Sequence, residues 1–272
     1  MTLRSSNAIP RRRIVPVIIA ALSAITISGC KTTQSEDSAS SYAMAGVPQT
    51  EADARSMVAA WGERYHANPE DPIAAVNYAQ GLRGTGQRQQ AAAVLERATI
   101  RDPKNMELLG AYGRALADVG NYQQALDVLS RAHTPDRPDW HILSVQGAVL
   151  DQTGRHEEAQ RYYATALKIA PDEPSVLSNL GLSYALSKDL VRAEMTLRRA
   201  LTRPRADPRV RQNLALVVGL QGRFAEAESL ARADLPPEIA AANVSYLRQM
   251  LAQQNGWKTT GQGGKPAGRP GT

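Results

Sequence analysis

A period of 34 residues runs five times through the middle of the chain, without an insertion or a deletion. The eighth position of every block is small: Ala79, Gly113, Gly147, Gly181 and Ala215. The twentieth is always alanine: Ala91, Ala125, Ala159, Ala193 and Ala227. The blocks themselves begin at Pro72, Met106, Trp140, Pro174 and Pro208. Such a period predicts a stack of similar units, none of which buries its apolar face alone.

Each block is expected to fold as two helices around a turn, since apolar residues recur at helical spacing on both sides of it. Glycine marks the turn in four blocks, at Gly86, Gly120, Gly154 and Gly222, and Lys188 takes its place in the fourth. Positions eight and twenty are expected to face each other. The large residues at position 24, such as Leu129 and Leu197, are expected to pack against the next block. Burial of each such leucine contributes roughly 1.5–3 kcal/mol.

This pattern resembles the tetratricopeptide repeat over residues 72–241. The resemblance implies an all-α solenoid of about five helix-turn-helix repeats, with flanking helices expected at 51–71 and 242–254. The fifth block ends with Ala231 and Asp234 where other blocks carry a large residue and an alanine, so it is expected to be loosely stacked or modified as a terminal cap.

The first 29 residues have the pattern of an export signal. Residues 1–13 carry four arginines and no acid, and residues 14–27 are almost entirely apolar. Ile27-Ser28-Gly29-Cys30 resembles a bacterial lipobox, which implies lipid attachment to Cys30. The alternative is a plain signal peptide with a coincidental cysteine. Because Lys31 is not the aspartate that retains many lipoproteins at the inner membrane, we expect the periplasmic face of the outer membrane.

Composition then limits the remaining segments. Residues 30–50 are rich in Ser, Thr and Ala and are expected to form a flexible tether, and residues 255–272 a disordered tail. Four of the 32 basic residues lie in the signal, which leaves 28 against 26 acidic residues, a net charge of +2. That balance argues against nucleic-acid binding. A single cysteine excludes an intrachain disulfide, so helix packing must stabilise the fold.

The sequence offers no catalytic constellation, so a non-enzymatic role without cofactor, metal or small-molecule substrate is expected. No pair among His66, His133, His141 and His156 has the spacing of a helical metal site. His133 and His141 flank a loop with aspartates that could hold a metal, although a polar connection between repeats is the favoured interpretation. His156 is interpreted as a solvated helix start.

Protein binding is the remaining function, because the first helices of stacked repeats line a concave groove. Positions that line it in the tetratricopeptide family imply a polar front half: Asn77, Gln80, Arg83, Arg114, Asp118 and Asp151. The rear half is amide and apolar: Ser178, Asn179, Leu182, Leu186, Gln212, Asn213, Leu216 and Leu220. Asn179 and Asn213 share position six, and an amide can both donate to and accept from a peptide backbone. The alternative is that these amides bond only locally.

Segments 131–140, 174–184, 210–228 and 241–247 together resemble the TadD lipoproteins of the Flp (Tad) pilus and tight-adherence systems. The resemblance covers nearly all of residues 51–254. It implies an outer-membrane lipoprotein that binds pilus assembly proteins, with a secretin subunit as the expected partner. The alternative is a general tetratricopeptide lipoprotein that serves another secretion, pilus or outer-membrane assembly machine.

Overall fold

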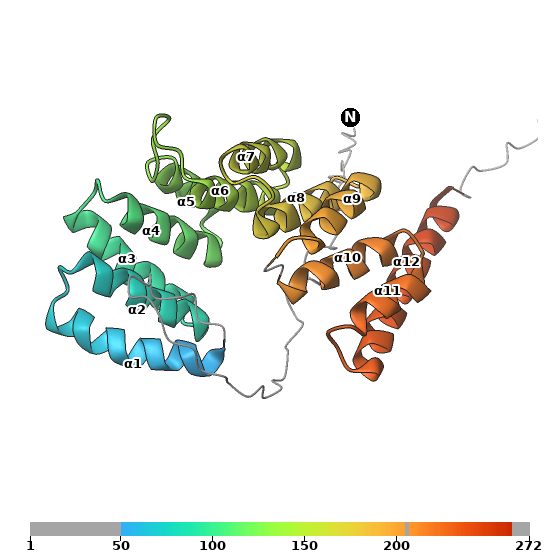
Figure 1. The fold of residues 1–272 in the computed structure, drawn as a ribbon, viewed down its shortest axis with the longest axis horizontal. Helices are drawn as coiled ribbons and strands as arrows, with labels where there is room; N and C mark the ends of the chain where they lie inside the picture. The colour runs from blue at the N-terminus through green and yellow to red at the C-terminus, as the bar shows by residue number, and fades with distance from the viewer. Residues whose placement is uncertain (1–49, 205–206, 263–272) are drawn as a thin grey trace, which may run out of the picture. The chain divides into compact units, whose positions relative to one another are not determined.

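The computed structural model describes residues 50–204 and 207–262, with side chains of the last helix up to residue 253. All regular structure in these residues is helical (Figure 1). The predicted signal, Cys30, residues 30–49 of the tether and the end of the tail lie outside the described residues. The helices are α1 (Glu51–Ala67), α2 (Pro72–Gly84), α3 (Arg88–Arg101), α4 (Met106–Asp118), α5 (Tyr122–Leu129), α6 (Trp140–Gln152), α7 (His156–Ile169), α8 (Pro174–Leu186), α9 (Leu190–Leu201), α10 (Pro208–Leu220), α11 (Phe224–Ala231) and α12 (Pro237–Gln262).

The predicted blocks coincide with pairs of helices, from α2 and α3 to α10 and α11. Each first helix starts at the residue where the sequence period starts its block. A polar residue precedes every one of these helices, and its side chain accepts a hydrogen bond from a backbone N–H of the first turn: Asp71, Asn105, Asp139, Glu173 and Asp207. These caps fix the starts of the blocks, because the first amides of a helix have no partner within it.

The turn inside each block needs a left-handed residue. Gly120 has φ of 84°, and Lys188 adopts 68° at the equivalent position of the fourth block. A lysine there is less favourable than glycine, since its Cβ crowds the backbone. The turn geometry is therefore the same where the sequence departs from glycine.

Close packing within a block explains the small residue at position eight. A Cβ added to Gly181 would lie 2.6 Å from Cγ of Leu197, and one added to Gly113 would lie 2.4 Å from Cγ of Leu129. Position 24 therefore packs on position eight of its own block as well as against the next block, where Leu95 shares a buried cluster with Leu108 of α4. Position twenty contributes backbone to the same crossing, since the Ala193 carbonyl oxygen would lie 3.3 Å from the Gly181 Cβ.

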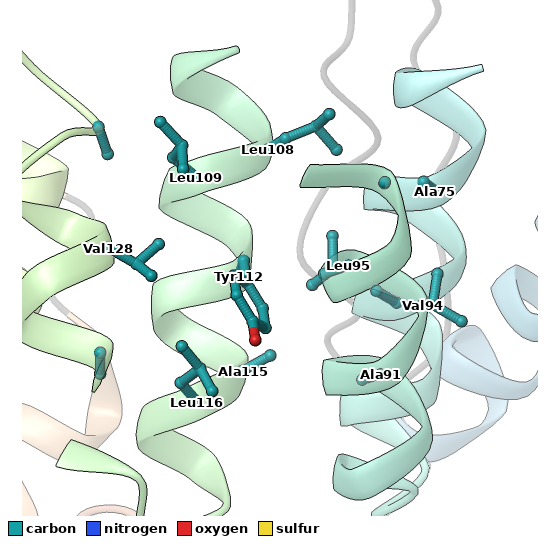
Figure 2. Close-up of a cluster of buried hydrophobic side chains, with 14 of the residues drawn as sticks. Ala75, Ala91, Val94, Leu95, Leu108, Leu109, Tyr112, Ala115, Leu116 and Val128 are labelled. Carbon is teal, nitrogen blue, oxygen red and sulfur yellow. The ribbon is translucent and has the colours of Figure 1, made fainter. Parts of the chain in front are cut away.

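Side chains of neighbouring blocks also pack against one another. Figure 2 shows one such region, where Leu108 and Tyr112 of α4 point toward Leu95 and Val94 of α3. All four are buried. The first helices also contact one another in order: α2 with α4, α4 with α6, α6 with α8 and α8 with α10. Within the described residues, no second helix contacts the next second helix, so the first helices form the inner row of the stack.

The end of the stack differs from the expected boundaries. Helix α12 begins at Pro237 and continues to Gln262, so the expected final helix at 242–254 is too short at both ends. Proline is favoured in the first turn of a helix, and no further proline follows before residue 266. Residues 255–262 are therefore helical, and the expected disordered tail is wrong for them. The fifth block ends early at Ala231, which packs with Ala215 and Ala240.

Candidate protein-binding groove

Two asparagines of the predicted groove connect successive first helices. The Nδ2 group of Asn179 on α8 donates to Oγ of Ser144 on α6 at 3.2 Å, and that of Asn213 on α10 donates to Oγ of Ser178 on α8 at 3.0 Å. Both asparagines are half-buried. Each amide is thus oriented by the preceding repeat, and its carbonyl oxygen is still able to accept from a ligand.

This arrangement lies between the two interpretations of the sequence. The asparagines do bond inside the protein, but to the neighbouring block and not to their own helix. Asn77 shows the local alternative, since its Nδ2 donates to the carbonyl oxygen of Ile73 one turn earlier and its side chain is buried. Ser178 is buried too, so it positions Asn213 and does not line an open surface. Ser144 was not predicted as a groove residue, although it occupies position five of its block, as Ser178 does in the next block.

The leucines of the rear half are half-buried: Leu182, Leu186, Leu216 and Leu220. In the described residues, other partly buried side chains pack against the hydrophobic core clusters, but none of these four leucines does. Gln212 is half-buried beside them on α10. A row of partly exposed leucines next to oriented amides suits a peptide with alternating apolar side chains and free backbone groups.

The front half is polar and partly self-paired. Arg83 on α2 forms an ion pair with Asp118 on α4, with both side chains about one third exposed. Burial, and then the positive charge of Arg83, lower the pKa of Arg114, an effect that Asp139 opposes. Gln80 is half-buried on the same helix as Arg83. In this half Arg83 and Asp118 are therefore already paired with each other, while the rear half keeps its apolar surface.

Asp151, expected in the groove, is buried instead. It accepts hydrogen bonds from Tyr163 Oη at 3.1 Å and Ser183 Oγ at 2.8 Å, and its Oδ1 lies 2.8 Å from Nδ1 of His156. Burial raises the pKa of the Asp151 carboxyl, and these three hydrogen bonds oppose the rise. His156 does start α7, as interpreted from the sequence, but its side chain is half-buried against Asp151 and not solvated. The cluster joins α6, α7 and α8, and a hydrogen-bonded buried carboxylate costs far less than a free one.

The remaining histidines show no convergence on a metal site. His141 stacks on Trp140, and its Nδ1 lies 3.1 Å from Oδ1 of Asp139. The loop before it closes through a bridge between Thr134 and Arg137, as a polar connection between repeats. No group of His, Cys, Asp or Glu in the described residues is placed to hold a metal ion. In that same part of the chain, no helix is both long and apolar enough to cross a membrane.

Comparison with protein families finds tetratricopeptide repeats within the third to fifth blocks. Residues 145–210 and 208–233 match tetratricopeptide repeat families, and residues 59–132 match the family of anaphase-promoting complex, cyclosome, subunit 3. The gap between residues 132 and 145 contains the polar loop before α6. No curated protein matches the chain.

Solved structures share the fold at low sequence identity. PilW, described as a widely conserved type IV pilus biogenesis factor, has a TM-score of 0.61 at 16% identity, covering 71% of this chain and 91% of its own. TTC0263, a thermophilic tetratricopeptide repeat protein of Thermus thermophilus, has a TM-score of 0.56 at 22% identity, covering 64% of this chain and 99% of its own. The pilF protein of Pseudomonas aeruginosa has a TM-score of 0.53 at 19% identity, covering 66% of this chain and 91% of its own. The all-helical solenoid predicted from the sequence is thereby confirmed as a tetratricopeptide repeat fold.

Proposed function

We propose that this chain is a protein-binding scaffold of the bacterial envelope that assists assembly of an Flp (Tad) pilus. The observation that carries the binding role is the rear half of the inner row, where Asn179 and Asn213 are oriented by serines of the preceding block beside four half-buried leucines. Such a surface binds an extended peptide or a partner helix through backbone hydrogen bonds and apolar contacts.

The assignment to pilus assembly rests on the sequence resemblance to TadD lipoproteins. PilW, a type IV pilus biogenesis factor, has the same fold, so the fold is compatible with work on a pilus. The partner we propose is a pilus assembly protein, with a secretin subunit first among them.

A lipid on Cys30 would hold the groove near such a partner at the periplasmic face of the outer membrane. One acyl chain binds a membrane only marginally, whereas two or more hold stably. A tether of the predicted length spans on the order of 25 Å root-mean-square if flexible. Confinement of this kind raises the local partner concentration toward the millimolar range, so a weak groove contact is sufficient.

The direct test is site-specific photo-crosslinking in cells that produce the chain at its normal level. A photoreactive residue at Leu216 is expected to capture a secretin subunit or another pilus assembly protein. The same residue at Ala164, which is exposed on α7, is the matched control and is expected to capture none. Capture of a component of another envelope machine at Leu216 would favour a general envelope scaffold over a role in pilus assembly. Equal capture at both positions would reject the groove as the binding surface.

Deletion of the gene and loss of the anchor test the cellular role separately. Deletion is expected to abolish surface pili and tight adherence while prepilin synthesis continues. Cys30→Ala is expected to move the protein out of the membrane fraction and to end its labelling by palmitate. A deletion strain with normal pili would refute the pilus role but not the binding groove, and unlabelled wild-type protein would refute the lipid anchor alone.

A further inference from the structure

Position seven of the blocks differs between the repeats in a way that leaves an opening in the third. Blocks one and two place tyrosine there, and blocks four and five place leucine; all four side chains are buried: Tyr78, Tyr112, Leu180 and Leu214. The third block has Gln146, a shorter side chain than tyrosine and a polar one. It is also the most unusual of the five for a buried site, since glutamine is mostly found on surfaces.

The tyrosines of blocks one and two show what this position normally holds. Tyr112 points from α4 toward α3 (Figure 2), and its hydroxyl accepts from Nε2 of Gln124 at 3.2 Å. Tyr78 stacks on Tyr65 of α1 with ring centroids 5.4 Å apart, and its hydroxyl accepts from Nε2 of Gln90 at 3.2 Å. In both blocks the ring fills the space beside the preceding helix, and its hydroxyl bonds to position nineteen of its own block.

In the third block the equivalent space is a crevice of about 250 Å³. Its lining comes from α5, α6 and α7: Gln123, Leu126, Asp127, Ser130, Gln146, Leu150, Arg155, Glu158 and Tyr162. Glu158 occupies position nineteen, as Gln124 does in the block before. Helix α5 has only 8 residues, against 14 in α3 and α7.

Gln146 marks the inner wall of the crevice. It is 3% exposed, and its buried Oε1 has no hydrogen-bond partner among the described residues. A buried acceptor without a donor costs free energy comparable to a lost hydrogen bond, so a ligand that supplies a donor gains from it. Apolar surface from Leu126, Leu150 and the Tyr162 ring lies around the same space. An engineered apolar cavity of roughly 150 Å³ in another protein binds benzene, so this crevice has room for one aromatic ring.

We propose that this crevice binds a tyrosine side chain of a partner protein, in the place that Tyr78 and Tyr112 fill in the earlier blocks. The ring packs between α5 and Tyr162, and the phenol donates its proton to Oε1 of Gln146 or to the Glu158 carboxylate. The Arg155 side chain is already engaged, since its Nε and Nη2 donate to Glu158 at 2.8 and 2.7 Å. The site is separate from the groove of the first helices, because second helices form two of its walls.

The probe for this site is N-acetyl-tyrosinamide, titrated into the isotope-labelled full chain and followed by NMR. We expect saturable shifts at the side-chain amide of Gln146 and at Leu126, with a dissociation constant in the millimolar range. N-acetyl-phenylalaninamide lacks the donor and is expected to bind about two- to ten-fold more weakly. N-acetyl-lysinamide is the third probe, because Asp127 and Glu158 would favour a cation if charge decided the binding.

Two variants assign the response to the crevice. Gln146→Tyr fills it from within, as in blocks one and two, and is expected to abolish binding of N-acetyl-tyrosinamide while the protein stays folded by circular dichroism. Gln152→Tyr adds the same side chain at an exposed position of the same helix and is expected to leave binding unchanged. Gln146→Met keeps the size of the side chain but removes the Oε1 acceptor, so it is expected to reduce the preference for N-acetyl-tyrosinamide over N-acetyl-phenylalaninamide. If Gln146→Tyr does not fold, this change in preference tests whether the probe binds in the crevice.

The proposal is overturned by any of three results. They are the absence of saturable shifts at Gln146 and Leu126, equal binding to wild type and to a folded Gln146→Tyr variant, and binding of N-acetyl-lysinamide as tight as that of N-acetyl-tyrosinamide.

Discussion

The crossing of α8 and α9 makes the sharpest stability prediction of this fold. A Cβ added to Gly181 would lie 2.6 Å from Cγ and 3.0 Å from Cδ2 of Leu197, and 3.3 Å from the Ala193 carbonyl oxygen. Leu197 is fully buried, so its branch point has no free space to enter. Overpacking of a tight core costs about 1–3 kcal/mol. Because alanine gains about 1 kcal/mol over glycine in a helix, we expect Gly181→Ala to lose up to about 2 kcal/mol of unfolding free energy.

Gly110 on α4 is the matched control. It is also buried in the first helix of a block, but its added Cβ would meet only the side chain of Ile142, whose flexible end, Cδ1, would lie at 2.6 Å. That end can rotate away, so the gain in helix propensity is expected to dominate. Gly110→Ala should therefore be neutral or stabilising by up to about 1 kcal/mol. Urea unfolding followed by far-ultraviolet circular dichroism gives both values.

A double substitution tests the named contact itself. Leu197→Ala alone should cost about 2–5 kcal/mol, since it leaves a cavity. Combined with Gly181→Ala, the total should be smaller than the sum by roughly 0.5–3 kcal/mol, because the new methyl enters the space that leucine left. If the two costs simply add, or if Gly181→Ala stabilises the protein as much as Gly110→Ala, the packing of position eight on position 24 is wrong.

Other predictions concern charge, the buried carboxylate and the groove. Although partial burial opposes its ionisation, hydrogen bonds from Arg198, Gln221 and Arg223 lower the pKa of Glu194 to about 2. The contribution of ionised Glu194 to the free energy of unfolding is present above the ordinary pKa of 4.5 and is lost as the pH falls toward 2. Glu194→Gln should therefore lower the free energy of unfolding by about 1 kcal/mol at neutral pH, allowing for solvent screening, and should change it little once the carboxylate is protonated. Asp151→Ala leaves the Tyr163 and Ser183 hydroxyls without their acceptor and should cost about 3 kcal/mol in urea unfolding, more than Asp151→Asn; equal losses would contradict the network. The double substitution Asn179→Ala and Asn213→Ala should weaken crosslinking from Leu216 with a small change in melting temperature, and unchanged crosslinking would remove the amides from the interface.

The repeat period predicts the starts of the first helices because the caps lie in the sequence at the same spacing. Asp71, Asn105 and Asp207 stand directly before their blocks, so local hydrogen bonding and the long-range period agree. The partners of side chains across blocks are less predictable. The bond from Asn213 to Ser178 depends on how far α10 is displaced along α8, and a period does not define that displacement. Asp151 shows the same limit, because its partners Tyr163 and Ser183 lie on two other helices, α7 and α8.

The groove positions carried over from the tetratricopeptide family assume that every block turns the same face inward. The third block departs from that assumption twice. It places Asp151 in the interior with His156, Tyr163 and Ser183, and it replaces a packing tyrosine by Gln146. The first change binds α6, α7 and α8 together through hydrogen bonds, while the second opens the boundary with α5. The third block is therefore held more firmly to the fourth than to the second, and the polar loop before α6 lies at the weaker boundary. Local opening should begin there, so amide exchange is expected to be faster in α5 than in α7; slower exchange in α5 would contradict this distribution of stability.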